Sequence, residues 1–301
     1  MKKTLSLLVA LIMALGLFGG IATAEGSLVY LVTMDKMDQH WVAVDHGASA
    51  MAAGLGLDYK WDAPERKDNA RQIEVLNNAV ADGANLILLA ATDPVAISTA
   101  VADAKAAGVM VIYVDSPANE PAIATLSTNN YNAGKLAAET MLGEFAAAGI
   151  EAGKIGIVSV NTATNSTMNR ENGFREVFDA DGRFEILTTE YKDGDAAASQ
   201  EAAQGFITGN EDLVGIYGCN EGSTVGVGNA IKSLNPEIIG VGFDQSDAIV
   251  ELLNQGFLKA AMVQNPFTMG FLGMAEAFAA LNGLPTGPAV IDTGVAVLRG
   301  E

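Results

Sequence analysis

From Ser27 onward, short β-rich apolar runs alternate with longer alanine-rich stretches of helical period. Parallel strands that are buried on both faces form such continuous apolar runs, and each pair needs a crossover helix. The repetition predicts an α/β fold of doubly wound parallel sheets with helices on both faces. We expect strands at 28–33, 58–61, 86–90, 109–114, 155–160, 184–191, 213–217, 238–243 and 258–263. The helices expected between them cover 39–55, 69–81, 95–107, 131–148, 166–179, 196–208, 223–234, 246–255 and 267–281.

The first 24 residues have the pattern of a secretory signal peptide. Lys2 and Lys3 precede an apolar stretch over residues 5–21, and Ala22-Thr23-Ala24 is a small-residue cleavage site. A membrane anchor is the alternative, because about 17 residues is the lower limit for spanning a bilayer. The cleavage site favours removal of residues 1–24, and no cysteine near the cut offers a lipid attachment point.

The remaining chain is longer than one compact core usually holds, which predicts two domains. A weak internal repeat supports the prediction of two domains. Residues 91–116 run from a loop through a helix to an apolar strand, Asp115 and a small polar residue, and residues 220–245 repeat that order around Asp244. Two similar doubly wound halves would place both acids beyond the carboxyl ends of strands, where ligands bind in such sheets.

Charge and cysteine content exclude several classes of partner. The formal net charge is -19, and it becomes -21 without Lys2 and Lys3. Such a surface repels phosphate backbones and anionic lipids, so no nucleic-acid partner is expected. The single cysteine, Cys219, cannot form a disulfide within the chain and is expected to be a small buried residue at a strand end. The two histidines, His40 and His46, do not have zinc-ligand spacing, and no metal or cofactor is expected.

The sequence carries no recognisable catalytic motif. It has no nucleophile elbow, phosphate-binding loop or zinc-protease helix, and Gly226-Val227-Gly228 falls inside an expected helix. Residues 179–182 loosely resemble a calcium loop, but the acid at the twelfth position is missing. We therefore expect a binding protein rather than an enzyme.

Hydrogen-bonding groups at strand ends are the candidate ligand contacts, together with the rings of His40 and Trp41. Carboxylates, amides and a guanidinium suit vicinal hydroxyls, and these candidates are Asp115, Asp244, Asn220, Gln264 and Arg170. Other roles stay open at this point. Trp41 suits a core, the two aspartates suit helix caps, and Arg170 suits pairing with Glu171 or Glu176.

The order of motifs along the whole chain resembles the ribose-type periplasmic sugar-binding proteins, which are type I periplasmic binding proteins and the substrate-binding components of sugar ABC transporters. The motifs that carry the resemblance are Thr92-Asp93, Val114-Asp115, Asn129-Asn130 with Ala133-Gly134-Lys135, Arg170 before Gly173-Phe174, Asn220-Glu221, Val241-Gly242-Phe243-Asp244, and Gln264.

The resemblance implies two Rossmann-like lobes, 25–128 plus 265–292 and 129–264 plus 293–301, joined by a three-crossover hinge near Thr128, Gln264 and Asp292. It implies ligand contacts at His40, Trp41, Asp115, Arg170, Asn220, Phe243, Asp244 and Gln264, with Asp38 and Thr128 as further candidates. Hinge closure would bury a sugar between Trp41 and Phe243.

Three departures from the family pattern point to a rebuilt pocket wall. Ser116 replaces an arginine that often follows the aspartate, Ala90 replaces an asparagine, and Gly194 replaces an aromatic residue before Asp195. The ligand is therefore open among ribose, another pentose, a hexose, an inositol and a sugar-like signal such as autoinducer-2.

The resemblance also implies a place in the cell and a set of partners. We expect a monomer in the periplasm that takes a small neutral sugar or polyol to the membrane permease of an ABC transporter, and a chemoreceptor as a possible second partner. The alternatives are a carrier for autoinducer-2 or a chemoreceptor ligand, a sugar-responsive repressor, and an exported α/β enzyme. The repressor would need a basic helix-turn-helix where this chain has a signal peptide.

Overall fold

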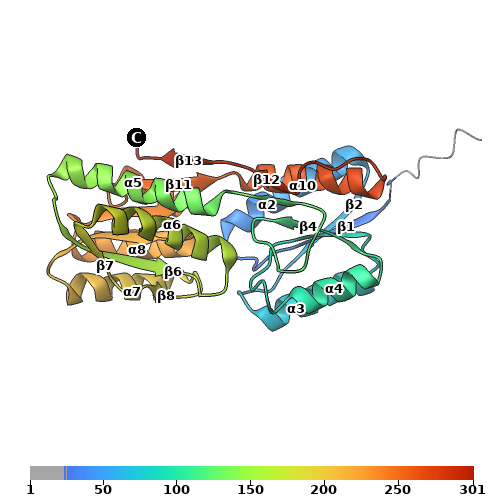
Figure 1. The fold of residues 1–301 in the computed structure, drawn as a ribbon, viewed down its shortest axis with the longest axis horizontal. Helices are drawn as coiled ribbons and strands as arrows, with labels where there is room; N and C mark the ends of the chain where they lie inside the picture. Colours follow the sequence, from blue (N-terminus) through green and yellow to red (C-terminus); the bar gives the residue numbers. More distant parts are fainter. Residues whose placement is uncertain (1–23, 25) are drawn as a thin grey trace, which may run out of the picture.

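The computed structural model describes residue 24 and residues 26–301, so the signal peptide predicted over residues 1–24 lies, apart from Ala24, outside the described residues. Two lobes lie side by side along the long axis of the molecule, and each is a largely parallel sheet with helices on both faces (Figure 1). The predicted α/β class and the two doubly wound halves are confirmed. In the described part of the chain, no helix has both the length and the apolarity needed to cross a membrane.

The N-lobe is built on a parallel sheet with the strand order β12-β5-β4-β3-β1-β2. Successive side chains of β1 point to opposite faces, so Val29 and Leu31 pack in one core cluster while Tyr30 and Val32 pack in another. The strands are β1 (Leu28–Val32), β2 (Asp58–Asp62), β3 (Leu86–Leu89), β4 (Met110–Val114), β5 (Thr125–Ser127) and β12 (Val290–Asp292). The helices are α2 (Gln39–Leu55), α3 (Asn69–Ala81), α4 (Ser98–Ala106) and α10 (Pro266–Leu281).

The C-lobe repeats this arrangement with the order β13-β11-β10-β9-β6-β7, while β8 also pairs with β6. Only β13 runs antiparallel to its neighbour, β11. The strands are β6 (Gly153–Ser159), β7 (Phe184–Ile186), β8 (Glu190–Tyr191), β9 (Leu213–Gly218), β10 (Ile239–Phe243), β11 (Ala260–Gln264) and β13 (Val295–Leu298). The helices are α5 (Asn130–Ala148), α6 (Asn165–Asp181), α7 (Ala196–Gly209), α8 (Glu221–Leu234) and α9 (Asp247–Asn254). Strands β4 and β10 therefore hold equivalent places in the two lobes.

The chain passes between the two sheets three times. It crosses after β5 at residues 128–129, between β11 and α10 at Asn265, and between β12 and β13 at residues 293–294. Helix α10 then packs on α2 and β4 of the N-lobe, and β13 returns to the C-lobe (Figure 1). Each lobe is consequently made of two separate stretches of sequence.

Paired glycines bring two helices into close contact in each lobe. In the C-lobe, a Cβ at Gly134 of α5 would lie 2.0 Å from the Arg170 carbonyl oxygen, and a Cβ at Gly173 of α6 would lie 2.0 Å from the Tyr131 carbonyl oxygen. In the N-lobe, Gly47 of α2 and Gly270 of α10 make the same reciprocal contact. These contacts hold the middle of α2 against the start of α10 and the middle of α6 against the start of α5, and α2 and α6 carry candidate site residues.

The structure differs from the sequence predictions at the ends of some elements and in the number of short strands. The strand expected over 184–191 divides into β7 and β8, because Thr189 turns to donate a hydrogen bond to Glu171 Oε1 at 2.6 Å. The helix expected from residue 95 begins at Ser98, because Asp93 first caps the N–H groups of Val95 and Ala96. Strands β5, β12 and β13 were not predicted, since three or four residues are too few for a periodic signal.

Candidate functional site

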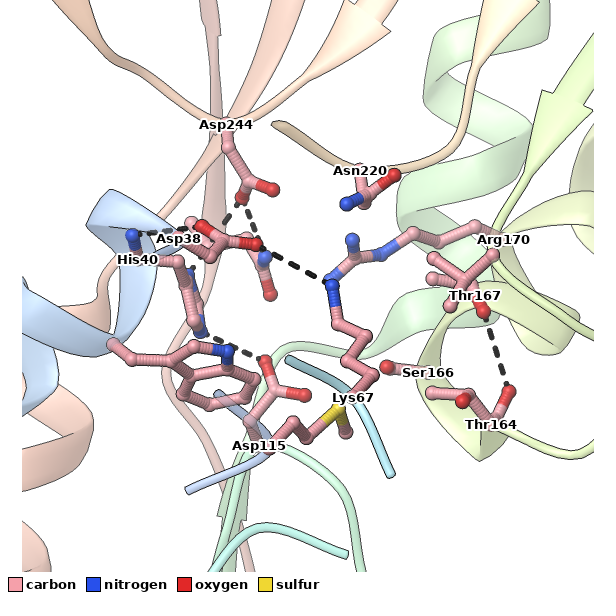
Figure 2. A pocket seen from close by; sticks show the side chains of 14 residues that line it. Asp38, His40, Lys67, Asp115, Thr164, Ser166, Thr167, Arg170, Asn220 and Asp244 are labelled. Carbon is pink, nitrogen blue, oxygen red and sulfur yellow. Dashed lines mark hydrogen bonds and ion pairs between the residues drawn. The ribbon is translucent and has the colours of Figure 1, made fainter. Parts of the chain in front are cut away.

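A small cavity lies where the two lobes meet. The side chains around it come from loops and helix starts that follow the strands of both sheets (Figure 2). The N-lobe contributes Met34, Asp38, His40, Trp41, Lys67 and Asp115, and the C-lobe contributes Val160, Thr164, Ser166, Thr167, Arg170, Asn220, Asp244 and Gln264.

Asp115 and Asp244 directly follow the buried strands β4 and β10 and face the same cavity. Both have left-handed backbone conformations, with φ of 62° and 71°. Their N–H groups donate to the carbonyls of Leu126 and Met262 on the next strand, at 2.8 and 2.9 Å. Neither acid caps a helix, so that alternative is wrong. Backbone strain of about 1–3 kcal/mol at each position is characteristic of binding and catalytic sites.

The His40 ring lies between these two acids. Its Nε2 is 3.1 Å from Asp115 Oδ2, and its Nδ1 is 3.7 Å from Asp244 Oδ1. Burial lowers the pKa of His40, but the carboxylates of Asp115, Asp244 and Asp38 outweigh burial and raise it to about 9. The imidazole is therefore a cation at neutral pH. Burial raises the pKa of Asp115, yet the His40 partner prevails and holds it below its usual range.

Burial also raises the pKa of Asp244, and here it prevails over the charges of Arg170 and His40. Gln264 Nε2 donates to Asp244 Oδ1 at 2.6 Å. The two equivalent acids thus have opposite pKa shifts, because Asp115 makes the shorter contact with the imidazolium while the charge of Asp38 adds to the effect of burial on Asp244.

Arg170 is buried at 2% exposure and is held by the C-lobe. Its Nε donates to Asn130 Oδ1 at 2.8 Å, its Nη1 donates to the Cys219 carbonyl at 2.9 Å, and the guanidinium stacks 4.1 Å from the Phe243 ring centroid. The alternative pairing with Glu171 or Glu176 is wrong, since those acids bind Arg175 and Lys135. A guanidinium has five N–H donors, so three remain for the cavity that Arg170 lines.

Three other side chains that line the cavity each have a buried polar atom without a hydrogen-bond partner in the described chain. They are Trp41 at Nε1, Asn220 at Nδ2 and Gln264 at Oε1. Asn220 caps α8 and uses only its Oδ1 for that, accepting from the Ser223 N–H. Trp41 is at once part of the N-lobe core and of the cavity wall. Buried polar atoms are normally paired, so these atoms mark positions where a ligand would bind.

Contacts between the lobes close the rim of the cavity. Gln39 N–H donates to Glu221 Oε2 at 2.9 Å, and Thr164 Oγ1 donates to the Thr92 carbonyl at 2.9 Å. Ser116 Oγ donates to Asp115 Oδ1 at 2.7 Å and lies 2.8 Å from Ser166 Oγ of the other lobe. The structure is therefore a closed arrangement of the two lobes.

A further contact at the rim joins two acids from opposite lobes, Asp38 and Glu221. Burial, together with the hydrogen bond and charge of Asp38, raises the pKa of Glu221 to about 8. Burial opposes ionisation of Asp38, but the charge of Lys67 and the bond from Glu221 keep its pKa below the usual range. In the closed arrangement Glu221 carries the proton and Asp38 carries the charge.

Most of the residues predicted for the site surround this cavity, and three do not line it. Phe243 is fully buried beneath Arg170, so the expected contact of its ring with a sugar is not possible in this arrangement. Thr128 lines a second cleft, which shares Asp115 with the cavity. Ser116 acts through Asp115 and Ser166. Sequence reasoning missed six cavity residues, which are Met34, Lys67, Val160, Thr164, Ser166 and Thr167.

The structure also describes the surroundings of Cys219 and of residues 179–182. Cys219 is fully buried just after β9, as predicted, and burial raises the pKa of its thiol to about 12. Residues 179–182 form the end of α6, where Gly182 has φ of 71° and caps the helix. No cluster of three or more metal-ligating side chains occurs within the residues that the structure describes.

Known proteins share this architecture. The family profile described as periplasmic binding protein domain matches residues 29–285. The ribose import binding protein RbsB of Haemophilus influenzae is 25% identical over 286 residues, covering 94% of each chain. A solute-binding protein of Agrobacterium radiobacter solved with D-arabinose has a TM-score of 0.87 and 27% identity, covering 91% of this chain and 94% of that one. An Agrobacterium vitis ABC transporter protein solved with D-fucose has a TM-score of 0.85 and 28% identity, covering 91% and 95%.

Proposed function

The chain belongs to the periplasmic binding protein family, and we propose that its cavity holds a neutral monosaccharide or a polyol of similar size. Like its relatives, the protein is the sugar-binding component of an ABC transporter and is not an enzyme. The observation that carries the proposal is the set of buried polar atoms on Trp41, Asn220 and Gln264 that surround one closed cavity and have no partner among the described residues. Hydroxyl groups both donate and accept, so a ring with several of them satisfies all three atoms.

The charge balance of the cavity supports a neutral ligand. The charged groups already pair with one another, Lys67 with Asp35 and Asp38, and protonated His40 with Asp115. Glu221 at the rim is protonated at neutral pH. An added carboxylate or ammonium would leave one buried charge without a partner, which is costly in a dry site.

Selectivity would come from the polar contacts rather than from shape. A ligand lacking one of the matched hydroxyls would leave Asn220 Nδ2 or Gln264 Oε1 buried and unpaired. Sites of that kind reject such analogues strongly. The indole N–H of Trp41 would add a donor to the contact that its ring makes with the ligand.

The test is calorimetric titration of ligand-free protein with a panel of neutral pentoses, hexoses, inositol and autoinducer-2, alongside uronates and amino sugars. Ligand carried through purification is first identified by mass spectrometry after release. Tight binding of a neutral polyhydroxylated compound supports the proposal. Binding restricted to charged compounds, or release of a ligand without hydroxyls, contradicts it.

We also propose how the protein works in transport. Residues 1–24 would direct export to the periplasm. The lobes 25–128 plus 265–292 and 129–264 plus 293–301 would rotate about a hinge near Thr128, Gln264 and Asp292. The ligand would favour the closed form through contacts made with both lobes at once, and a membrane permease, or a chemoreceptor, would recognise the closed monomer. Export is tested by N-terminal sequencing of the protein from periplasmic extracts, where Glu25 is the expected first residue.

A further inference from the structure

Lys67 reaches into the cavity from the loop between β2 and α3, and its side chain is only 10% exposed (Figure 2). Its Nζ lies 3.4 Å from Asp35 Oδ2 and 3.9 Å from Asp38 Oδ2. Charge-assisted hydrogen bonds of an ammonium are normally about 2.7–2.9 Å long. The two carboxylates therefore balance the charge of Lys67 through long contacts, and an ammonium with three donors keeps at least one of them for a further acceptor.

The ammonium is charged in this setting. Burial lowers the pKa of Lys67, but the charges of Asp38 and Asp35 outweigh burial and keep it above its usual value. An ion that has been largely removed from water gains strongly from any oxygen that completes its hydrogen bonds.

A glycine of the opposite lobe makes room for this ammonium. A Cβ at Gly194, which has φ of 73°, would lie 2.8 Å from Lys67 Nζ and 2.7 Å from Asn220 Nδ2. Gly194 cannot move away, because its carbonyl is packed against Gly222 at the start of α8, where a Cβ would lie 1.8 Å from it. Any side chain at position 194 would fill the corner that Lys67 now shares with Asn220.

We propose that Lys67 is a specificity-determining residue that donates a charge-assisted hydrogen bond to a ligand oxygen at the corner formed with Gly194 and Asn220. This inference rests on the proposed function and names a donor that the family resemblance does not supply. Where the family pattern has an aromatic residue before Asp195, this site has Gly194 and a cation from the other lobe. The site therefore selects sugars that present an oxygen acceptor at this corner over those that present a deoxy carbon or an apolar edge.

The experiment compares Lys67→Met with the wild type and with Lys60→Met, a control in which an exposed lysine loses its pairing with Asp82 outside the cavity. The probe is the monosaccharide that binds the wild type most tightly, together with its complete set of monodeoxy analogues. Lys67→Met is expected to weaken binding of the parent sugar by about 10- to 100-fold, the effect of losing a hydrogen bond to a charged group. Lys60→Met is expected to bind like the wild type.

The deoxy series separates ligand contact from a structural role. One deoxy position is expected to cost the wild type about tenfold or more and to cost Lys67→Met nothing, while the other positions cost both proteins equally. Equal losses at every position, or unchanged binding of the parent sugar by Lys67→Met, overturn the inference. If the wild type binds no sugar of the panel, the proposed function itself is wrong. If the wild type binds a sugar but Lys67→Met binds it equally well, only the inference about Lys67 is wrong.

A second variant approaches the same corner from the C-lobe and keeps the inference testable if Lys67→Met folds poorly. Gly194→Ala places a methyl group against both the ammonium and the Asn220 amide. It is expected to weaken binding and to remove discrimination at the same deoxy position. Retention of that discrimination in Gly194→Ala contradicts the assignment of Lys67.

Discussion

Asp115 and Asp244 are equivalent residues of the two lobes, and they meet across the cavity through one imidazole. Each follows a central strand, each has a positive φ, and each N–H donates to the neighbouring strand. His40 bridges them, with Asp115 at 3.1 Å and Asp244 at 3.7 Å. The duplication of one fold has thus produced a pair of carboxylates whose chemistry differs because a single cation is nearer to one of them.

Replacing each aspartate by asparagine removes its charge, and the two variants are expected to differ in stability. Asp115→Asn breaks the buried pair with His40 and should lower the free energy of unfolding of the ligand-free protein by about 1–3 kcal/mol, since His40 can release its proton in response. Asp244→Asn removes a carboxylate whose ionisation burial disfavours, so stability should be unchanged or higher. Both variants should bind the sugar at least tenfold more weakly. Denaturant unfolding and calorimetry measure the two effects, and equal destabilisation by both variants would contradict this account.

Ligand affinity is expected to fall as the pH rises from 6 to 8. In the closed form Glu221 has a pKa of about 8, against 4.5 for an ordinary glutamate, because Asp38 and burial disfavour its charge. The groups facing it are Asp38, Asp244 and the Gln39 N–H. Opening removes Asp38 and releases the proton, so closure takes up a proton within this window and loses up to about tenfold in affinity per pH unit.

Titrations in buffers of different ionisation enthalpy measure that proton uptake directly. Glu221→Gln cannot titrate and should show a flatter pH profile, while the His40 pKa of about 9 leaves a residual decline above neutral pH. An affinity that rises with pH would rule out the shared proton between Asp38 and Glu221.

The crossing of α5 and α6 provides a matched pair of glycine variants. Gly134→Ala would put a Cβ 2.0 Å from the Arg170 carbonyl and should destabilise the protein by about 1–3 kcal/mol through overpacking. Gly143→Ala lies in the same helix, where no atom of residues 26–301 comes within 4 Å of the added Cβ, and it should stabilise the protein by about 0.5–1 kcal/mol. Thermal unfolding compares the two. Because Gly134 sets the position of Arg170, its variant should also weaken sugar binding, whereas Gly143→Ala should not.

Contacts at the rim are expected to change how strongly the ligand favours the closed form, without changing the closed form itself. Ser166→Ala removes the partner of Ser116 across the lobes, and it should raise the dissociation constant by about two- to tenfold. Small-angle scattering should show the same compact form for wild type and variant at saturating ligand. A variant that stays extended at saturation would mean that the serine pair is required for closure itself.

Much of the fold was predictable because its signals are local. Helices α2 and α3 begin and end where the sequence predicted, since Asp38 and Asp68 cap their first turns and apolar periodicity defines their length. The acids after β4 and β10 were predicted because the end of a buried apolar run is visible in the sequence. Lys67 was missed because nothing in its own segment distinguishes it from a solvated lysine beside Asp68. Phe243 was assigned to the cavity wall, but the packing of Arg170 over its ring buries it.

The sequence by itself determined the α/β class, the duplication, the lobes' strand and helix pattern and the strand-end acids, because each depends on periodicity or on neighbours along the chain. Only the tertiary structure decided which atoms face the ligand, where the protons lie, and that Lys67 meets Gly194 across the lobes. Those features arise from contacts between residues that are distant in the sequence, such as His40 with Asp115 and Lys67 with Gly194. Their distances and burial set the charges, and no local pattern encodes them.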